Sequence, residues 1–281
     1  MSRHDVVVGL TDAVGSLGRS THQLAHGLTH FFAHCSGVWR LFLQTLYFSF
    51  VAPFTRRTEL RKQLCPMMSN VGVRSFPICA LTTFLMGAIL VLQSGEPLKR
   101  FGQIQEVPGA VALSLTREIA PLLTAIIMTA RVGASFTAVL ASMKINEELM
   151  ALEAMVIHPV GYLVAPRFLS MAVMLPCLTV MSYVLGMFGG AIVAYTVYDI
   201  PFSLYIQKTE AYLNMTDINS GLVKALVFGV LITQICCYFG LKTEGGSVGL
   251  GRNVMVAVVS SLVAVILADA LATAFINNYI F

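Results

Sequence analysis

Three charged side chains, Arg117, Glu118 and Arg131, lie in the otherwise apolar stretch TREIAPLLTAIIMTARVGAS (116–135). A guanidinium can bind phosphate oxygens through paired hydrogen bonds, and a carboxylate can pair with a cation or exchange a proton. A charge near the centre of a spanning helix costs roughly 2.5–3.5 kcal/mol on insertion scales, so it needs a partner or an aqueous cavity. The stretch is therefore our first candidate for a functional site, and a purely structural ion pair is the alternative.

Other kinds of chemistry lack the residues that they need. The sequence has no Gly-Lys dipeptide, hence no GxxxxGK[ST] loop for nucleotide phosphates, and no HExxH zinc motif. Its six cysteines form no CxxC pair, and most lie in apolar runs, where a thiol packs as a small hydrophobic group. Asp269 is the one further candidate in an apolar run. We expect this chain to bind no metal and no cofactor, and an enzyme is the least supported function class.

The composition defines the class of protein. Of the 281 residues, 57% are hydrophobic and only 11% are charged, and the mean hydropathy is +0.78. Such a composition excludes a soluble globular domain and indicates a polytopic membrane protein. The formal net charge of +4 is small and its Lys and Arg residues are scattered, so we expect no nucleic-acid partner.

Five segments are long and apolar enough to cross a membrane as helices of about 20 residues. We place them at about 71–93, 109–141, 168–198, 221–241 and 253–277. The second is too long for one straight span, and we expect a break near Pro121, which lacks a backbone donor. The fold class is therefore an all-α membrane domain over residues 63–281, preceded by an N-terminal region, 1–62.

The orientation of the spans follows from a basic cluster ahead of the first one. The cluster comprises Arg56, Arg57, Arg61, Lys62 and Arg74. Because cytoplasmic flanks are enriched in Lys and Arg, we expect the N-terminus in the cytoplasm and, after five spans, the C-terminus on the outer side.

A histidine repeat in the N-terminal region predicts an amphipathic helix. His22, His26, His30 and His34 recur every fourth residue and share one arc of a helix, opposite an apolar arc rich in Phe and Leu. We favour a helix that lies in the membrane interface and exposes its histidine side chains to water. Metal binding and pH sensing remain open, because histidines four residues apart can share an ion and imidazole titrates near neutrality.

The segment 142–157 predicts a short amphipathic helix between the second and third spans. Acidic residues alternate there with Leu and Met, and Pro159 and Gly161 follow. Its candidate contact residues are Lys144, Glu147, Glu148, Leu152, Glu153 and Met155. The pattern alone fits an ordinary connector and a docking surface for a soluble partner equally well, since methionine surfaces adapt to what they bind.

An ordered block of motifs covers the last four fifths of the chain: it includes LSLTREIAPLLTAIIMTARVGAS, HPVGYLVAPRF and VVSSLVAVILADALAT. This block resembles the MlaE/YrbE family of ABC-transporter permeases, which serve Mce-type lipid transport systems. The matching positions are Gln93, Leu98, Phe101, Gly102, Arg117, Glu118, Pro121, Leu123, Arg131, Val132, Gly133, Glu147, Ala151, Leu152, Glu153, Met155, Pro159, Tyr162, Leu163, Val164, Pro166, Arg167 and Asp269. Two elements depart from the family pattern: residues 138–141 lack its acidic residue, and Val254 and Met255 replace a Thr-Thr pair.

The resemblance implies a homodimeric permease in the inner membrane of a bacterium, which moves phospholipid for outer-membrane lipid homeostasis. The implied partners are an ABC ATPase subunit that carries ATP and Mg²⁺ and grips the 142–157 helix, an Mce-domain protein and a small STAS-like regulatory subunit. Arg117, Glu118, Arg131 and Gln93 would line the lipid cavity. Structural roles would fall to Pro121, Gly133, Pro159, Arg167 and Asp269.

A proton- or ion-coupled secondary carrier is the alternative function, with Glu118 and Asp269 as the titrating sites. Five spans without an internal repeat argue against it, because many carriers are built from duplicated halves.

Overall fold

The computed structural model describes residues 34–49 and 57–279, which are helical apart from short connections. The chain divides into two compact units, Met1–Leu43 and Gln44–Phe281. In the first unit the described residues from His34 onward are helical, and the rings of Trp39 and Phe42 lie 5.6 Å apart. His22, His26 and His30, and with them most of the predicted amphipathic helix, lie outside the described residues.

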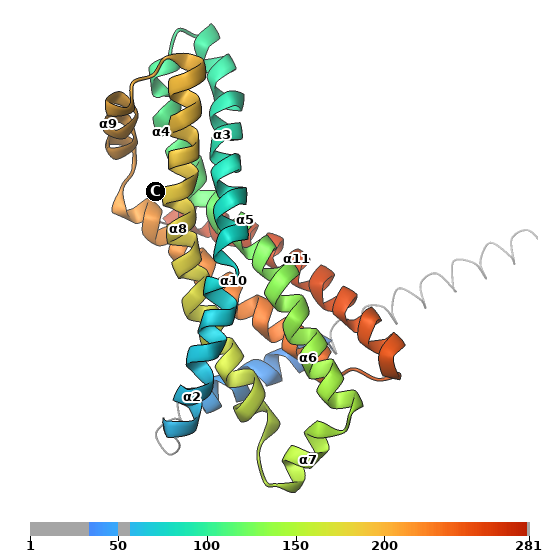
Figure 1. The fold of residues 1–281 in the computed structure, drawn as a ribbon. Coiled ribbons are helices and arrows are strands. Elements are labelled where there is room, and N and C mark those ends of the chain that lie inside the picture. Colours follow the sequence, from blue (N-terminus) through green and yellow to red (C-terminus); the bar gives the residue numbers. More distant parts are fainter. Residues whose placement is uncertain (1–33, 50–56, 280–281) are drawn as a thin grey trace, which may run out of the picture. The chain divides into compact units, whose positions relative to one another are not determined.

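The second unit contains the five predicted membrane spans, which the structure confirms as helical runs long and apolar enough to cross a bilayer (Figure 1). The runs are Gln63–Arg100, Ile104–Ile145, Val160–Tyr198, Met215–Leu241 and Gly246–Ile276. Their elements are α2 (Arg57–Met68), η2 (Ser69–Val73), α3 (Phe76–Arg100), η3 (Ile104–Glu106), α4 (Val107–Ser114), η4 (Leu115–Ile119), α5 (Ala120–Met128), η5 (Thr129–Gly133), α6 (Ala134–Ile145), η6 (Val160–Val164), α8 (Ala165–Tyr198), α10 (Met215–Leu241) and α11 (Gly246–Tyr279). Helices suit these apolar segments because a backbone in lipid must satisfy its hydrogen bonds internally.

The second run carries two π-helical segments, η4 and η5, and each contains candidate charges. Arg117 and Glu118 lie in η4, and Arg131 lies in η5. Pro121 is the second residue of α5, directly after η4, and the helical run continues through it. A π-turn inserts an extra residue into a helix and is frequent at functional sites. Where the sequence predicted a break near Pro121, the structure thus has a π-helical segment directly before the proline.

Two short helices mark opposite ends of the bundle. Helix α7 (Glu148–Ala154) follows the second run, and α9 (Phe202–Tyr212) follows the third, where it packs beside α4 (Figure 1). Because successive spans reverse direction, α7 and α9 lie at opposite ends of the bundle, which we call the α7 end and the α9 end. The sequence predicted a helix near α7, but it did not predict α9.

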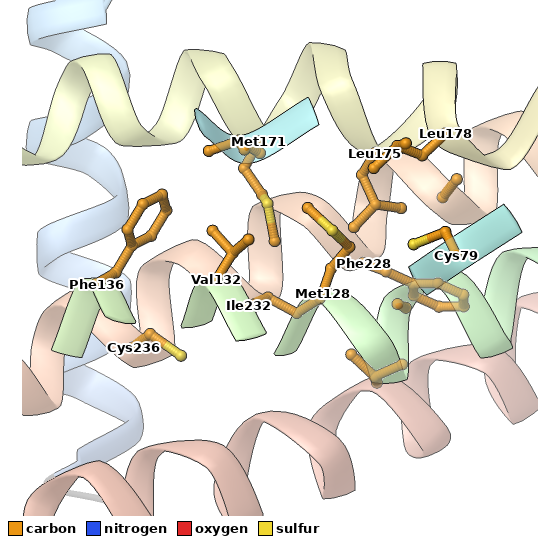
Figure 2. Close-up of a cluster of buried hydrophobic side chains, with 14 of the residues drawn as sticks. Cys79, Met128, Val132, Phe136, Met171, Leu175, Leu178, Phe228, Ile232 and Cys236 are labelled. Atoms are coloured by element: carbon orange, nitrogen blue, oxygen red, sulfur yellow. The ribbon is translucent and has the colours of Figure 1, made fainter. Parts of the chain in front are cut away.

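The spans pack through small residues and one large apolar cluster. Methionine, leucine and aromatic side chains of α5, α8 and α10 interdigitate around Met128, Met171 and Phe228 (Figure 2). Helices α3 and α8 approach so closely at Gly87 that a Cβ there would lie 1.8 Å from the Gly186 carbonyl oxygen. Small residues permit such contacts where lipid provides no hydrophobic drive for helix association. Helix α10 packs against α5, α6, α8 and α11, and so brings its polar residues into the bundle.

Candidate functional site

Arg117 forms an ion pair with Asp217, a residue that the sequence analysis did not select. The Nη2 and Nε atoms of Arg117 lie 2.6 and 2.7 Å from Asp217 Oδ1. The other oxygen, Oδ2, accepts a 3.0 Å hydrogen bond from the backbone N–H of Asn214, in the capping box that begins α10. One buried carboxylate therefore both closes the start of α10 and compensates the charge of Arg117.

Lys224 joins Glu118 to Asp269. Its Nζ lies 2.7 Å from Glu118 Oε2 and 3.1 Å from Asp269 Oδ1, and it donates a 2.7 Å hydrogen bond to the hydroxyl of Thr273. The Thr273 hydroxyl is in turn 3.0 Å from Glu118 Oε1. Lys224 also donates to the Arg117 carbonyl oxygen at 3.2 Å. These residues of η4, α10 and α11 form one network, which we call the polar network: Arg117, Glu118, Asp217, Lys224, Asp269 and Thr273.

The polar network has a buried side and an accessible side. The side chains of Asp217 and Lys224 are 0% and 2% exposed, whereas those of Arg117 and Glu118 are 28% and 37% exposed. Two cations face three carboxylates, so the fully ionised network has an excess of negative charge. A group that enters from the accessible side thus meets a guanidinium and a carboxylate on neighbouring residues.

Arg131 and Gln93 do not belong to the polar network. Arg131 is 14 residues after Arg117, which is about 21 Å along a helix. Its guanidinium donates a hydrogen bond to the hydroxyl of Ser75. Gln93 is exposed on α3, and no member of the network lies on that helix. The structure thus brings together Arg117, Glu118 and Asp269 of the predicted site residues and places Arg131 elsewhere.

The amphipathic helix predicted over residues 142–157 is shorter in the structure than the sequence pattern indicated. Helix α6 continues to Ile145, and α7 starts at Glu148 after Glu147, whose φ of 61° is left-handed. Leu149 packs inward, Leu152 is half-buried, and the remaining face is acidic and methionine-rich. The exposed residues of this region are Lys144 at the end of α6, Glu147 in the turn, and Glu148, Met150, Glu153 and Met155 in or directly after α7. An exposed apolar and acidic face at one end of the bundle is available for contact with a soluble protein.

The residues for which we predicted structural roles lie at close packing points. A Cβ at Gly133 would lie 2.8 Å from Cys236 Sγ, and Pro121 is buried in α5. The buried Arg167 donates a hydrogen bond to the Leu163 carbonyl, and its guanidinium lies 5.7 Å from the centre of the Phe136 ring. Pro159 occupies the N-cap position of η6. Gly133, Pro121 and Arg167 thus lie at buried, closely packed positions of the bundle.

A second polar cluster, also missed from the sequence, holds α9 against the bundle. Glu106 accepts hydrogen bonds from Lys208 and from the Tyr212 hydroxyl, the latter at 2.8 Å. The hydrogen bond to the Glu106 carboxylate raises the pKa of Lys208 and that of Tyr212.

Among the described residues, no group of three or more His, Cys, Asp or Glu side chains is arranged to hold a metal ion.

Comparison with known proteins places these features in a family. A family model described as Permease MlaE matches residues 64–275. The chain belongs to the MlaE permease family. It is therefore an ABC transporter permease and a multi-pass membrane protein.

Relatives of the chain occur in bacteria and in a plant. A probable ABC transporter permease protein of Rickettsia typhi is 37% identical over 242 residues, which are 86% of this chain and 92% of the relative. One from Synechocystis is 35% identical over 74% of this chain and 80% of the relative. The chloroplastic protein TRIGALACTOSYLDIACYLGLYCEROL 1 of Arabidopsis thaliana is 32% identical over 74% of this chain and 59% of its own length. The similarity to the Rickettsia relative thus extends over most of both chains.

Proposed function

We propose that this MlaE permease moves phospholipid, and that the polar network contacts the lipid headgroup during transport. The observation that carries the proposal is the partial exposure of Arg117 and Glu118 within a membrane-spanning segment. Charged side chains in such segments usually mark a substrate or ion path. The name of the Arabidopsis relative refers to a diacylglycerol lipid, which also supports a lipid substrate.

The two accessible groups suit a zwitterionic headgroup. A phosphodiester would accept paired hydrogen bonds from the Arg117 guanidinium. An amine would be attracted to Glu118, because the polar network holds three carboxylates against two cations. Asp217 and Lys224 lie behind these groups and keep them in place, so the accessible pair would be preorganised for the headgroup.

The assembly that we propose is a homodimer in the inner membrane of a bacterium, with a separate ABC ATPase and an Mce-domain partner. The basic cluster ahead of the first span supports placing the α7 end in the cytoplasm, with the N-terminus inside and the C-terminus in the periplasm. The acidic, methionine-rich face of α7 would then face the ATPase, and a small STAS-like subunit would act through that ATPase. The polar network would lie in the half of the membrane nearer the periplasm.

Reconstituted transport tests the headgroup role. The permease and its ATPase are placed in vesicles, and movement of a labelled phosphatidylethanolamine is followed for three variants. Arg117→Lys keeps a cation opposite Asp217 but loses the paired donors of the guanidinium, Glu118→Gln removes the accessible carboxylate, and Gln103→Ala is the exposed control. We expect transport to fall at least tenfold in the first two variants, with assembly and the amount of folded protein unchanged. If both variants assemble and transport at the rate of the unaltered protein, the network does not contact the lipid.

A proton- or ion-coupled carrier is the second candidate, and the excess of carboxylates in the polar network favours it. Glu118 and Asp269 would then exchange a proton with their shared partner Lys224. In this case transport would follow an imposed proton gradient and would need no ATP. Transport that stops without ATP and ignores the gradient removes this candidate.

A further inference from the structure

A pocket towards the α7 end of the bundle contains Arg131, the second arginine of the run Ile104–Ile145. The pocket has a volume of about 160 Å³, several times the roughly 30 Å³ share of one water molecule. Its lining residues come from η2 and from η5 with the start of α6: Asn70, Val71, Arg131, Val132, Ser135 and Phe136. Both walls therefore include a π-helical segment, the kind of irregularity that often accompanies a binding site.

The pocket lies where the apolar part of the first span begins. Arg131 donates to Ser75, the residue just before α3, and the neighbouring Arg74 is exposed. The first span begins near residue 71 and the second ends near residue 141, so the pocket lies in the half of both spans nearer the α7 end. A group bound in the pocket would thus come from the leaflet at the α7 end.

The charges around the pocket are uncompensated in the part of the chain that the structure describes. No described carboxylate forms an ion pair with Arg131, and no acidic residue lines the pocket. A second guanidinium, that of Arg74, donates a 3.3 Å hydrogen bond to Asn70, at the edge of the pocket. A cation in a spanning helix needs a partner, and an open pocket beside it gives an anion access.

We propose that this pocket binds a phosphate group, supplied by a phospholipid of the leaflet at the α7 end. Arg131, Ser135 and Asn70 provide the hydrogen-bond donors for the phosphate oxygens. Val71, Val132 and Phe136 provide an apolar wall for the ester-linked part of the lipid. The site is separate from the polar network, so it is a second lipid site and does not rest on the headgroup role of Arg117 and Glu118.

Native mass spectrometry of the whole chain tests the proposal. The protein is released from nanodiscs that contain either dioleoyl phosphatidylglycerol or dioleoylglycerol, which has the same acyl chains without the phosphate. We expect the unaltered protein to retain one more phosphatidylglycerol per chain than Arg131→Ala, and binding of that lipid to weaken about tenfold on loss of the guanidinium. Arg252→Ala is the matched control, because Arg252 is an exposed arginine at the same end and does not line the pocket.

A second variant keeps the test informative if Arg131→Ala does not fold. In Ser135→Asp the new carboxylate lies beside Arg131 and compensates its charge, so we expect a folded protein that has lost the same lipid. Equal retention of phosphatidylglycerol by the unaltered protein and Ser135→Asp overturns the proposal, as does equal retention of dioleoylglycerol. A separate titration with inorganic phosphate distinguishes the source: saturable, Arg131-dependent binding of phosphate without lipid retention supports the phosphate site and overturns its assignment to lipid.

Discussion

The ammonium group of Lys224 lies 2.7 Å from the carboxylate of Glu118, although the two residues are 106 positions apart and belong to different spans. Lys224 also contacts Asp269 of a third span at 3.1 Å. One buried lysine therefore connects η4, α10 and α11. In a low-dielectric region such a contact is strong when complete and costly when broken, because a charge left alone there is poorly solvated.

Removal of the lysine tests this connection. Lys224→Met leaves two carboxylates without their shared cation, and we expect the free energy of unfolding to fall by about 3 kcal/mol. Thermal unfolding of the protein in nanodiscs measures the loss. A triple variant that adds Glu118→Gln and Asp269→Asn removes the unpaired charges, so we expect it to recover most of the stability. If the triple variant is no more stable than Lys224→Met alone, the loss comes from packing and the electrostatic explanation is wrong.

The glycine contact between α3 and α8 gives a prediction about packing. Gly87→Ala would place a Cβ 1.8 Å from the backbone oxygen of Gly186, and a backbone atom cannot rotate away as a side chain can. The helices must separate, and we expect a destabilisation of about 1–3 kcal/mol. Gly251→Ala in α11 is the control, since nothing lies within 4 Å of a Cβ at that position. Unfolding midpoints of the two variants that agree within error would contradict the close contact.

The sequence predicted the spans well because each is a long apolar run whose only stable form in lipid is a helix. It also singled out Arg117, Glu118 and Asp269, since a charge within such a run is conspicuous. It did not identify their partners. Asp217 lies just before the run predicted for the fourth span, and Lys224 lies near its start, where a charge reads as an end of the helix. Their spacing of seven residues, which puts both on one face of α10, was the available signal.

Helix α9 was missed for a different reason. Its sequence, FSLYIQKTEAY, is too short and too polar for a span and carries no strong periodic pattern. The helix is held by tertiary contacts, chiefly those of Glu106 with Lys208 and Tyr212, which join residues about a hundred positions apart. The sequence likewise grouped Arg131 with Arg117, because both are charged residues of one span, and only their depth in the structure separates them.

The contacts of Glu106 predict how the anchoring of α9 depends on pH. The pKa of Lys208 is raised above its ordinary value of 10.5 by its hydrogen bond to Glu106, so the folded state holds the proton more tightly. The contribution is therefore complete below pH 10.5 and is lost as the pH rises through the raised value. Deprotonation of Tyr212, whose pKa is also raised, acts in the same direction.

Unfolding of the Glu106→Gln variant measures this dependence. We expect its unfolding midpoint to be lower than that of the unaltered protein by a constant amount from pH 7 to about pH 10, and the difference to shrink at higher pH. Glu210→Gln, at an exposed position of the same helix, is the control and should leave the midpoint unchanged. A difference between Glu106→Gln and the unaltered protein that grows with alkaline pH would refute the assignment.

The exposed face of α7 predicts which residues connect the permease to an ATPase. Glu148 and Glu153 are exposed on this helix, so reversing both charges with Glu148→Lys and Glu153→Lys should change the stability of the permease by no more than about 0.5 kcal/mol each. The same change would place cations opposite a partner surface whose basic charges complement Glu148 and Glu153. The resulting repulsion weakens binding and slows association. We therefore expect the ATPase to copurify at less than a tenth of its usual ratio with a fully folded permease. The control is Glu244→Lys, which reverses an exposed charge in the loop before α11 at the same end of the bundle. If both changes reduce copurification equally, the effect reflects the general charge of that end; if neither does, the ATPase binds elsewhere and α7 is an ordinary connector.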